Sequence, residues 1–403
     1  MSIAELGETI KTEKMKMNFG PQHPATHGTL RIEMELDGET VVSANPEIGF
    51  LHCGFEKLCE HKSYNQIVNI TDRMNYLSPF CNNLAFILAV EKLFDLKIPK
   101  RGQYIRVILA ELSRIADHCL CVGAQALDLG AFTAFLYLFE ERENIYDIME
   151  MISGNRLMTT YTRVGGFARD REFTDYHIKE IRRATSGLYK TIDEVEKLLN
   201  QNKIFHGRTI GIGVVSGKDA INYGLTGPIL RATGIDWDIR VSHPYTSYED
   251  FDFDVPIGEN GDIFDRYLVR MEEMRQSLRI VEQAMQNLPD GPENAEEEDK
   301  YVLPPKDEVY TTIEGLIHQF EIIMENRGFK PPIGEVYFRT ESPNGELGYM
   351  ISSNGGNSPY RCRVRPPSLV NYQILEPMLT GQMLSDTVAI LGSLNVIAGE
   401  LDR

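Results

Sequence analysis

The sequence predicts an α+β protein in which a mainly helical bundle core is flanked by β structure towards the N- and C-terminal ends. Near the N-terminus, apolar and polar residues alternate over 30–36, as in a half-buried strand. Between 78 and 151, apolar residues recur with helical spacing in three long segments, which is typical of a helical bundle. Short strand-like segments return after Pro332. We expect four regions, namely a polar tail (1–17), an N-terminal β region with a histidine-containing loop (18–66), a helical core (67–330) and C-terminal strands with a terminal helix (331–403).

The N-terminal β region begins with a loop, Gly20–Gly28, that leads into a hairpin. Leu30 to Leu36 alternate with polar residues, Asp37-Gly38 forms a tight turn, and 40–43 returns as the second strand.

The helical core is marked by helix start and stop signals. Ser78-Pro79 resembles an N-cap followed by a proline at the first helical position, and Pro99 ends this first helix. An irregular, β-containing insertion is expected near 205–260, and the acidic stretch Asp290–Lys300 is expected to be a solvated loop. Further helices are expected at 104–127, 132–151, 175–200, 262–288 and 386–397, and strands at 335–340, 347–352 and 360–364.

The composition restricts the function classes. The chain has 403 residues, 42% of them hydrophobic, and a formal net charge of −18, which argues against nucleic acid and against a basic surface docked on anionic lipid. No stretch approaches the ~18 apolar residues of a membrane span, and the first residues carry no export signal. Six scattered cysteines indicate free thiols in a reducing compartment.

The loop Gly20–Gly28 is the most unusual segment of the sequence. Two prolines and two glycines among nine residues exclude a helix and indicate a stiff turn. His23 and His27 can therefore face a cavity as hydrogen-bond or proton donors. Taken alone, two loop histidines are more often structural.

Asp128 and Tyr76 are ambiguous on their own. Asp128 lies among apolar residues, so it needs an imidazolium or another cation as its partner, or else it caps the helix that begins near Gly130. Tyr76 precedes a helix start. A phenol there can donate a hydrogen bond to a ligand carbonyl, or its ring can simply pack while its hydroxyl contacts solvent.

Two further patterns do not support a cofactor site. The residues around Cys53 and Cys59 lack the Cys-x2-Cys spacing usual in zinc and iron–sulfur sites, so we expect no metal. The glycines of Gly211–Gly217 are spaced wrongly for a dinucleotide-binding loop.

Taken together, these segments resemble the NuoD family, the forty-nine-kilodalton-type subunit of complex I. The family resembles the large subunit of [NiFe]-hydrogenases, which implies that fold. Hydrogenases hold nickel and iron with two Cys-x2-Cys pairs that this chain lacks, so the homologous cavity is implied to hold a quinone head group. The matching segments are Gly20–Gly28, Glu47–His52, Gly54–Lys57, Asp72–Tyr76, Ala89–Leu93, Ile105–Leu112, Leu127–Ala131, Arg163–Gly166, Gly261–Arg266, Gly345–Tyr349 and Gly399–Arg403.

The resemblance implies roles for individual residues. His27 and Tyr76 are expected to bind the two quinone oxygens, with Asp128 paired to His27. His23 is expected to be a further quinone-binding residue. Arg73 matches a position close to a [4Fe–4S] cluster held by the neighbouring NuoB-type subunit. Near that cluster Met158 stands where many family members have a histidine.

The resemblance also implies partners and location. No cofactor is expected on this chain, and the cluster, FMN and NADH belong to partner subunits. NuoB-, NuoC- and NuoI-type subunits and the NuoH-type membrane subunit are the expected partners, on the cytoplasmic side of the cell inner membrane. The function implied is reduction of menaquinone or ubiquinone by a proton-translocating NADH:quinone oxidoreductase. A structural scaffold and a hydrogenase-type subunit are the alternatives.

Three departures from the family pattern bear on the chemistry. Without a titratable histidine at Met158, the partner cluster is expected to have a low potential with weak pH dependence, which suits a low-potential quinone such as menaquinone. Cys53 replaces an arginine that is common in mitochondrial members. Asn395 stands in place of an aspartate followed by proline, which removes a fixed kink before the last turn.

Overall fold

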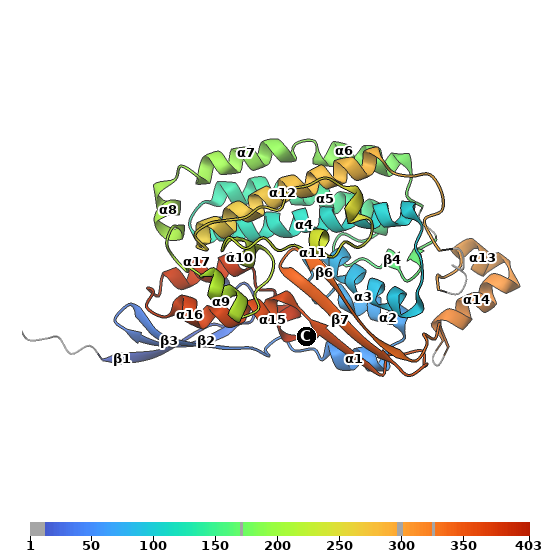
Figure 1. The fold of residues 1–403 in the computed structure, drawn as a ribbon, viewed down its shortest axis with the longest axis horizontal. Coiled ribbons are helices and arrows are strands. Elements are labelled where there is room, and N and C mark those ends of the chain that lie inside the picture. Colours follow the sequence, from blue (N-terminus) through green and yellow to red (C-terminus); the bar gives the residue numbers. More distant parts are fainter. Residues whose placement is uncertain (1–12, 170–171, 296–300, 325–326) are drawn as a thin grey trace, which may run out of the picture.

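Long helices form one layer of the molecule, and two small sheets lie beneath it. The structure is a computed structural model, and it describes residues 13–169, 172–295, 301–324 and 327–403. In Figure 1 the helical layer lies above the C-terminal sheet, the N-terminal sheet lies at the left end, and a helix pair projects at the right. No helix among the described residues is long and apolar enough to cross a membrane.

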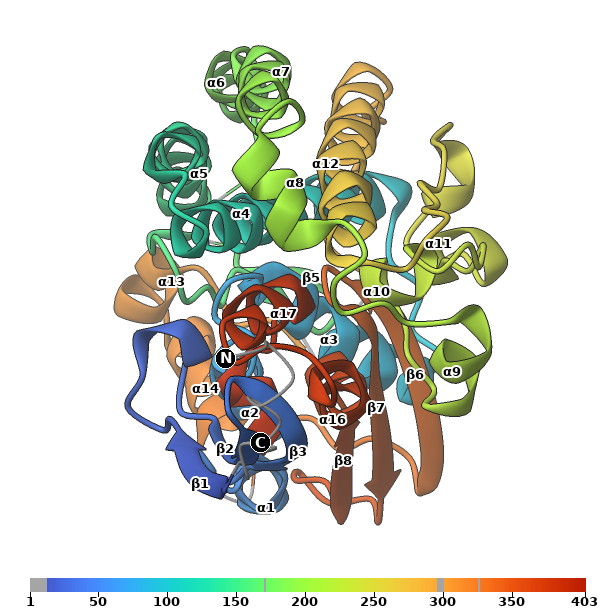
Figure 2. The same ribbon diagram turned by 90° about the vertical axis from the view of Figure 1, so that its left-hand side faces the viewer.

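The helical layer is built on helices that the apolar periodicity predicts. Pro79 stands in the first turn of one helix, Pro99 is the N-cap of the next, and Gly154, in the left-handed conformation, ends a third. The expected helix 175–200 is instead two helices, because the chain turns at Ser186-Gly187. Figure 2 shows the layer end-on. Its members are α4 (Lys100–Asp128), α5 (Phe132–Ser153), α6 (Asp175–Thr185), α7 (Leu188–Leu199) and α12 (Ile263–Gln286), and α3 (Pro79–Phe94) lies below it against the C-terminal sheet.

The N-terminal sheet is antiparallel, in the order β1 (Lys14–Phe19), β2 (Arg31–Asp37), β3 (Thr40–Glu47). The hairpin around Asp37-Gly38 is confirmed. The prediction of a polar tail over 1–17 is wrong for its last residues, because Lys14 to Met17 pair with β2. This pairing provides hydrogen-bond partners for the backbone N–H and C=O groups there. Residues 1–12 lie outside the described part of the chain.

The segment 205–260 contains short helices and no strand, so the expectation of β structure there is wrong. All of its residues are described. Side chains of Asn202, Ser216 and Asp238 accept backbone N–H groups at helix starts, and this capping favours helical turns over strands. The helices are α8 (Lys203–Thr209), α9 (Gly217–Asn222), α10 (Pro228–Arg231) and α11 (Ile239–Ser242), with a 3-10 turn at Tyr248–Asp250.

The C-terminal sheet β6–β7–β8 is antiparallel and confirms the three expected strands. The expected helix 386–397 ends earlier, because Asn395 adopts the left-handed conformation (φ 51°). The elements are β6 (Gly334–Ser342), β7 (Gly345–Ser353), β8 (Arg361–Arg365), α15 (Pro367–Asn371), α16 (Leu375–Leu379), α17 (Asp386–Leu394) and α18 (Ala398–Asp402).

Short elements complete the fold. A two-stranded hairpin, which the sequence did not indicate, follows α5, and the helix pair α13–α14 is the one at the right of Figure 1. Of the acidic stretch, residues 290–295 form a loop, and residues 296–300 lie outside the described residues. These elements are α1 (Phe55–His61), α2 (Tyr64–Thr71), β4 (Thr162–Arg163), β5 (Gly166–Phe167), α13 (Lys306–Thr311) and α14 (Ile313–Ile323).

Candidate functional site

The histidine loop is held in one shape by its own backbone and by its neighbours. Pro24–Thr26 form a single 3-10 turn, and His27 follows in the left-handed conformation (φ 51°). The Thr26 hydroxyl donates to the carbonyl of His23 at 2.7 Å. Gly20 has φ +85°, and a Cβ there would lie 2.1 Å from the Leu30 carbonyl oxygen, so only glycine fits. The loop therefore presents His27 from a rigid turn.

His27 pairs with Asp128, which is the last residue of α4. Nε2 of His27 lies 2.5 Å from Oδ2 of Asp128, and the two side chains are 27% and 20% exposed. The alternative in which Asp128 caps the next helix is wrong, because α5 has Ala131 as its N-cap and no side-chain cap. The pair is therefore partly shielded, yet still reachable from the surface.

Exposed apolar residues lie close to Asp128 in the sequence. Leu127 and Phe132 flank Asp128 in the chain and are 38% and 55% exposed. The Phe132 ring stacks on Phe135 with centroids 6.1 Å apart. An imidazole–carboxylate pair at the edge of exposed aromatic and aliphatic side chains suits a ligand with a polar head in an apolar setting.

His23 has a structural role in the loop. Its Nδ1 accepts a hydrogen bond from the backbone N–H of Ala25 at 3.2 Å, which caps the 3-10 turn. Its ring packs on Phe19 with centroids 4.3 Å apart. His23 is exposed and does not contact Asp128.

Tyr76 lies in the turn between α2 and α3 and is half-buried. The side-chain oxygen of Asn75 accepts the N–H groups of Leu77 and Ser78 at 3.1 and 3.3 Å, which fixes this turn. Burial raises the pKa of the Tyr76 phenol, and the carboxyl groups of Asp117 and Glu400 raise it further. No hydrogen bond among the described residues joins Tyr76 to the His27–Asp128 pair.

Arg73 and Met158 line one pocket of about 380 Å³ on the protein surface. The Arg73 guanidinium donates to the carbonyl of Asn69 and to Asp72. Burial raises the pKa of Asp72 to about 6, although the positive charge of Arg73 opposes this shift. Arg73 and Met158, which the family resemblance places near the same partner cluster, are thus neighbours in the fold. The remaining lining residues are Asn69, Asp72, Asn155, Arg156, Leu157 and Thr160.

The sequence did not single out Asp402, which organises the segment beside the histidine loop. Its two carboxylate oxygens accept the N–H groups of Gly49 and Leu51 at 2.9 and 2.6 Å. His52 Nδ1 lies 2.7 Å from the Asp402 carbonyl oxygen. The available signal was its place in Gly399–Arg403, one of the segments that resemble the family pattern.

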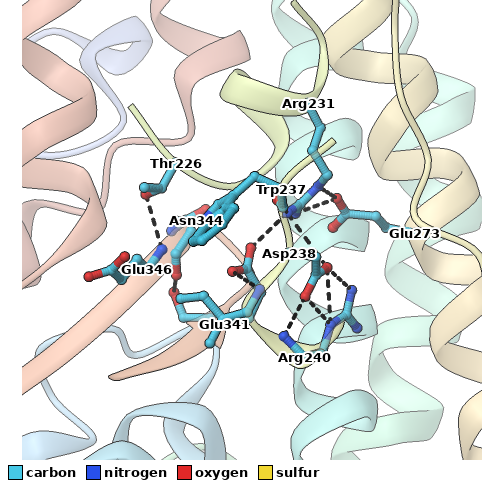
Figure 3. A network of polar contacts seen from close by, with 12 residues as sticks. Thr226, Arg231, Trp237, Asp238, Arg240, Glu273, Glu341, Asn344 and Glu346 are labelled. Atoms are coloured by element: carbon cyan, nitrogen blue, oxygen red, sulfur yellow. Dashed lines mark hydrogen bonds and ion pairs between the residues drawn. The ribbon is translucent and has the colours of Figure 1, made fainter. Parts of the chain in front are cut away.

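A buried network of ion pairs ties the helical layer to the C-terminal sheet (Figure 3). Arg231 contacts Glu273 of α12 at 2.7 Å and Glu341 of β6 at 2.8 Å. Arg240 contacts Asp238 at 2.7 Å and Glu111 of α4 at 3.2 Å. Because each charge is buried and paired, the network holds α4, α10, α11, α12 and β6 in one geometry.

All six cysteines are free thiols, and Cys53 alone among them is exposed. Among the described residues there is no group of three or more His, Cys, Asp or Glu side chains arranged to hold a metal ion.

Fold and site together define an α+β protein with a layer of long helices over two sheets and a partly exposed imidazole–carboxylate pair. The family described as respiratory-chain NADH dehydrogenase, 49 Kd subunit, matches residues 128–403. Proteins named as a subunit of NADH-quinone oxidoreductase are similar over almost the whole chain. That of Geotalea uraniireducens is 51% identical over 393 residues, which cover 97% of this chain and 99% of the relative. That of Geobacter metallireducens is 50% identical over 97% of this chain and 99% of the relative. That of Myxococcus xanthus is 48% identical over 99% of this chain and 95% of the relative. The chain belongs to the family of the 49-kDa subunit of respiratory-chain NADH dehydrogenase.

Proposed function

We propose that this chain is the quinone-binding core subunit of a proton-translocating NADH:quinone oxidoreductase. The observation that carries the proposal is the 2.5 Å contact between His27 and Asp128 at the edge of an apolar surface. Membership of the 49-kDa subunit family supplies the reaction, and relatives about 50% identical are named for it.

Reduction of a quinone to a quinol takes two electrons and two protons. His27 donates one proton to a quinone oxygen, and Asp128 stabilises the imidazolium before the transfer. Tyr76 donates to the other oxygen. Donors close to both oxygens stabilise the negative charge that develops during reduction. His23 supports this arrangement by capping the turn that carries His27.

Electrons enter on the side of Arg73 and Met158. The pocket that these two residues line is open at the surface and accommodates a subunit of the NuoB type that holds a [4Fe–4S] cluster. The positive charge of Arg73 favours the reduced form of such a cluster. This chain carries no cofactor of its own, and FMN and NADH bind to other subunits.

The subunit is attached to the cytoplasmic side of the cell inner membrane through its partners. None of the described helices is able to span a bilayer, so the NuoH-type subunit provides the membrane attachment. NuoC- and NuoI-type subunits are further partners of this chain in the complex. Menaquinone is the preferred substrate, because Met158 provides no titratable group that would raise the potential of the electron donor.

The test uses the purified complex carrying Tyr76→Phe or His27→Ala. Each change removes one proton donor, so quinone reduction by NADH falls by about tenfold or more, while electron transfer from NADH to a soluble acceptor is unchanged. Tyr360→Phe is the matched control, because Tyr360 is 71% exposed. If both variants keep full quinone reductase activity, the chain is a structural scaffold. Hydrogen uptake by the complex would instead indicate a hydrogenase-type subunit.

A further inference from the structure

Two fully buried carboxyl groups, those of Asp117 and Glu400, lie next to the turn that carries Tyr76. Both side chains belong to residues with 0% exposure. Asp117 is on α4 and Glu400 is on α18, which packs on the Tyr76 turn. A Cβ on Gly399 would lie 2.7 Å from the carbonyl oxygen of Met74, so the backbones of the turn and α18 touch.

Glu400 has no cation for a partner. Its Oε1 accepts hydrogen bonds from the backbone N–H of Ser368 at 3.2 Å and from the Ser368 hydroxyl. Its Oε2 has no hydrogen-bond partner in the described structure, and no salt bridge to Glu400 exists among the described residues. An ionised carboxylate buried in this way is strongly destabilised, so the protonated form is favoured.

Asp117 is linked to Glu400 through a chain of amides. Nδ2 of Asn395 lies 2.8 Å from Oδ1 of Asp117 and 2.6 Å from Oδ1 of Asn344. Asn344 in turn lies close enough to Glu400 to lower its pKa. Asn75, the residue before Tyr76, donates to Oδ2 of Asp117 at 3.4 Å. The two acids therefore form one buried polar cluster with the Tyr76 turn.

The charges of this cluster act on one another. Burial raises the pKa of Glu400 to about 8, with Asp117 raising it further and Ser368 opposing the shift. Burial also raises the pKa of Asp117, whereas His118 lowers it. Both carboxyl groups raise the pKa of Tyr76, which places all three groups within electrostatic range. The other titratable groups that interact with either acid are Cys81, Cys121, Tyr146 and Tyr349, and Arg270 and Glu273 act on His118.

We propose that Glu400, with Asp117, stores the proton that restores Tyr76 after Tyr76 has protonated the quinone. This inference rests on the proposed function. The O–H bond of Tyr76 breaks and its proton joins the quinone oxygen, which has become negative through electrons delivered from NADH by the partner subunits. The O–H bond of Glu400 then breaks, and its proton passes to the phenolate directly or through one water molecule. The carboxylate of Glu400 that remains is reprotonated from solvent before the next turnover.

The cluster is suited to this task for a physical reason. A phenolate beside buried carboxyl groups is unstable while those groups are ionised, so a neutral acid next to it is the efficient donor. An acid that is protonated near neutral pH and loses its proton at slightly alkaline pH has the affinity required of such a donor. Glu400 and Asp117 are fully buried, so they act through Tyr76.

The test compares pH profiles of quinone reduction by the purified complex carrying Glu400→Gln or Ser368→Ala. The unaltered complex should lose activity as the pH rises through about 8, where Glu400 ionises. Glu400→Gln removes the stored proton, so kcat falls by about tenfold, the alkaline decline near that pH disappears, and KM for quinone is unchanged. Ser368→Ala removes one donor that favours the ionised form, so the alkaline decline moves to higher pH. In infrared difference spectra, the carbonyl band of a protonated carboxylic acid disappears in Glu400→Gln.

Two outcomes overturn the proposal, and they differ from failure of the proposed function. If Tyr76→Phe abolishes quinone reduction while Glu400→Gln keeps the full rate and the original pH profile, the proton store is refuted and the quinone site stands. If Tyr76→Phe itself leaves the rate unchanged, both are refuted. If Glu400→Gln prevents assembly, Ser368→Ala decides, because an unshifted alkaline decline in that variant rules out Glu400 as the group that titrates.

Discussion

Nε2 of His27 and Oδ2 of Asp128 lie 2.5 Å apart, although 101 positions separate the two residues in the sequence. The loop supplies the imidazole from the N-terminal β region, and the last residue of α4 supplies the carboxylate. Helix α17 lies beside the carboxylate, since a Cβ on Gly392 would be 3.7 Å from Oδ2 of Asp128. The pair is therefore a product of three separate parts of the chain.

Replacing Asp128 by Asn removes the negative charge that faces His27. Because an amide does not stabilise an imidazolium, quinone reduction by the complex is expected to fall by about tenfold or more. Asp95→Asn is the matched control, since Asp95 is an exposed aspartate that ends α3. Steady-state rates with NADH and a short-chain quinone provide the measurement. Equal rates in both variants would show that the pair has no part in the reaction.

Gly399→Ala should displace α18 from the turn that carries Tyr76. The new Cβ would lie 2.7 and 2.8 Å from the carbonyl oxygens of Met74 and Arg73, which forces the backbones apart. We expect a loss of stability of about 1–3 kcal/mol together with reduced quinone reduction.

Gly207→Ala is the control for this change. Gly207 lies in α8, and nothing is within 4 Å of a Cβ placed there, so the free energy of unfolding should stay the same or rise by up to ~1 kcal/mol. Urea unfolding of both variants and of the unaltered chain makes the comparison. A Gly399→Ala variant as stable and active as Gly207→Ala would contradict the close packing of α18.

Glu273→Gln should destabilise the fold strongly. Glu273 neutralises Arg231 in the buried network (Figure 3) and accepts a contact from His118 at 2.8 Å. Removing its charge leaves Arg231 underpaired inside the protein, which costs about 3–5 kcal/mol. Glu35→Gln is the same chemical change at an exposed pair with Lys14, where the loss should stay below about 1 kcal/mol. Equal effects in denaturant unfolding would mean that the buried network does not support the fold.

The free energy of unfolding should depend on Glu400 at neutral and alkaline pH. Folding raises the pKa of Glu400 from 4.5 to about 8, so the folded state favours the protonated form. This stabilisation is complete below about pH 4.5 and is lost as the pH rises towards 8. Between pH 6 and pH 9, the free energy of unfolding should therefore fall by about 3 kcal/mol less in Glu400→Gln than in the unaltered chain. Glu376→Gln, at an exposed glutamate of α16, should behave like the unaltered chain. Identical pH dependence in all three would contradict the shifted pKa.

Met158→His should alter the electron donor of the partner subunit. Met158 lines the pocket beside Arg73, and a titratable imidazole there should raise the midpoint potential of the cluster and make it pH-dependent. A redox titration of the assembled complex, monitored by electron paramagnetic resonance at several pH values, measures both. A high, pH-dependent potential in the unaltered complex would contradict the preference for a low-potential quinone.

Patterns with a strong local cause were predictable from the sequence. The hairpin at Asp37-Gly38 and the long helices follow from alternation, apolar periodicity and prolines at helix starts. Boundaries that depend on a single backbone conformation were not predictable. Asn395 ends α17 in the left-handed region, and the 205–260 segment is helical because its capping side chains outweigh a strand pattern.

For the candidate site, the sequence indicated which residues carry chemistry, but it did not decide between their alternative roles. Asp128 had two possible roles, and the placement of Ala131 at the start of α5 excludes capping. His23 turned out to cap its own turn. Asp402 and Glu400 lie in a segment that resembles the family pattern, but the pattern gave neither of them a role, because an acidic residue acquires its character from what surrounds it.

The sequence by itself determined the α+β class and the order of most long elements. It also showed that the loop carrying His27 resembles a family pattern. These features depend on short-range spacing and residue type. Only the tertiary structure decided that His27 meets Asp128, that Arg73 and Met158 share a pocket, and that two buried carboxyl groups lie close to Tyr76. The reason is that hydrogen bonding, burial and charge pairing depend on distances between residues that are remote in the chain, and folding alone sets those distances.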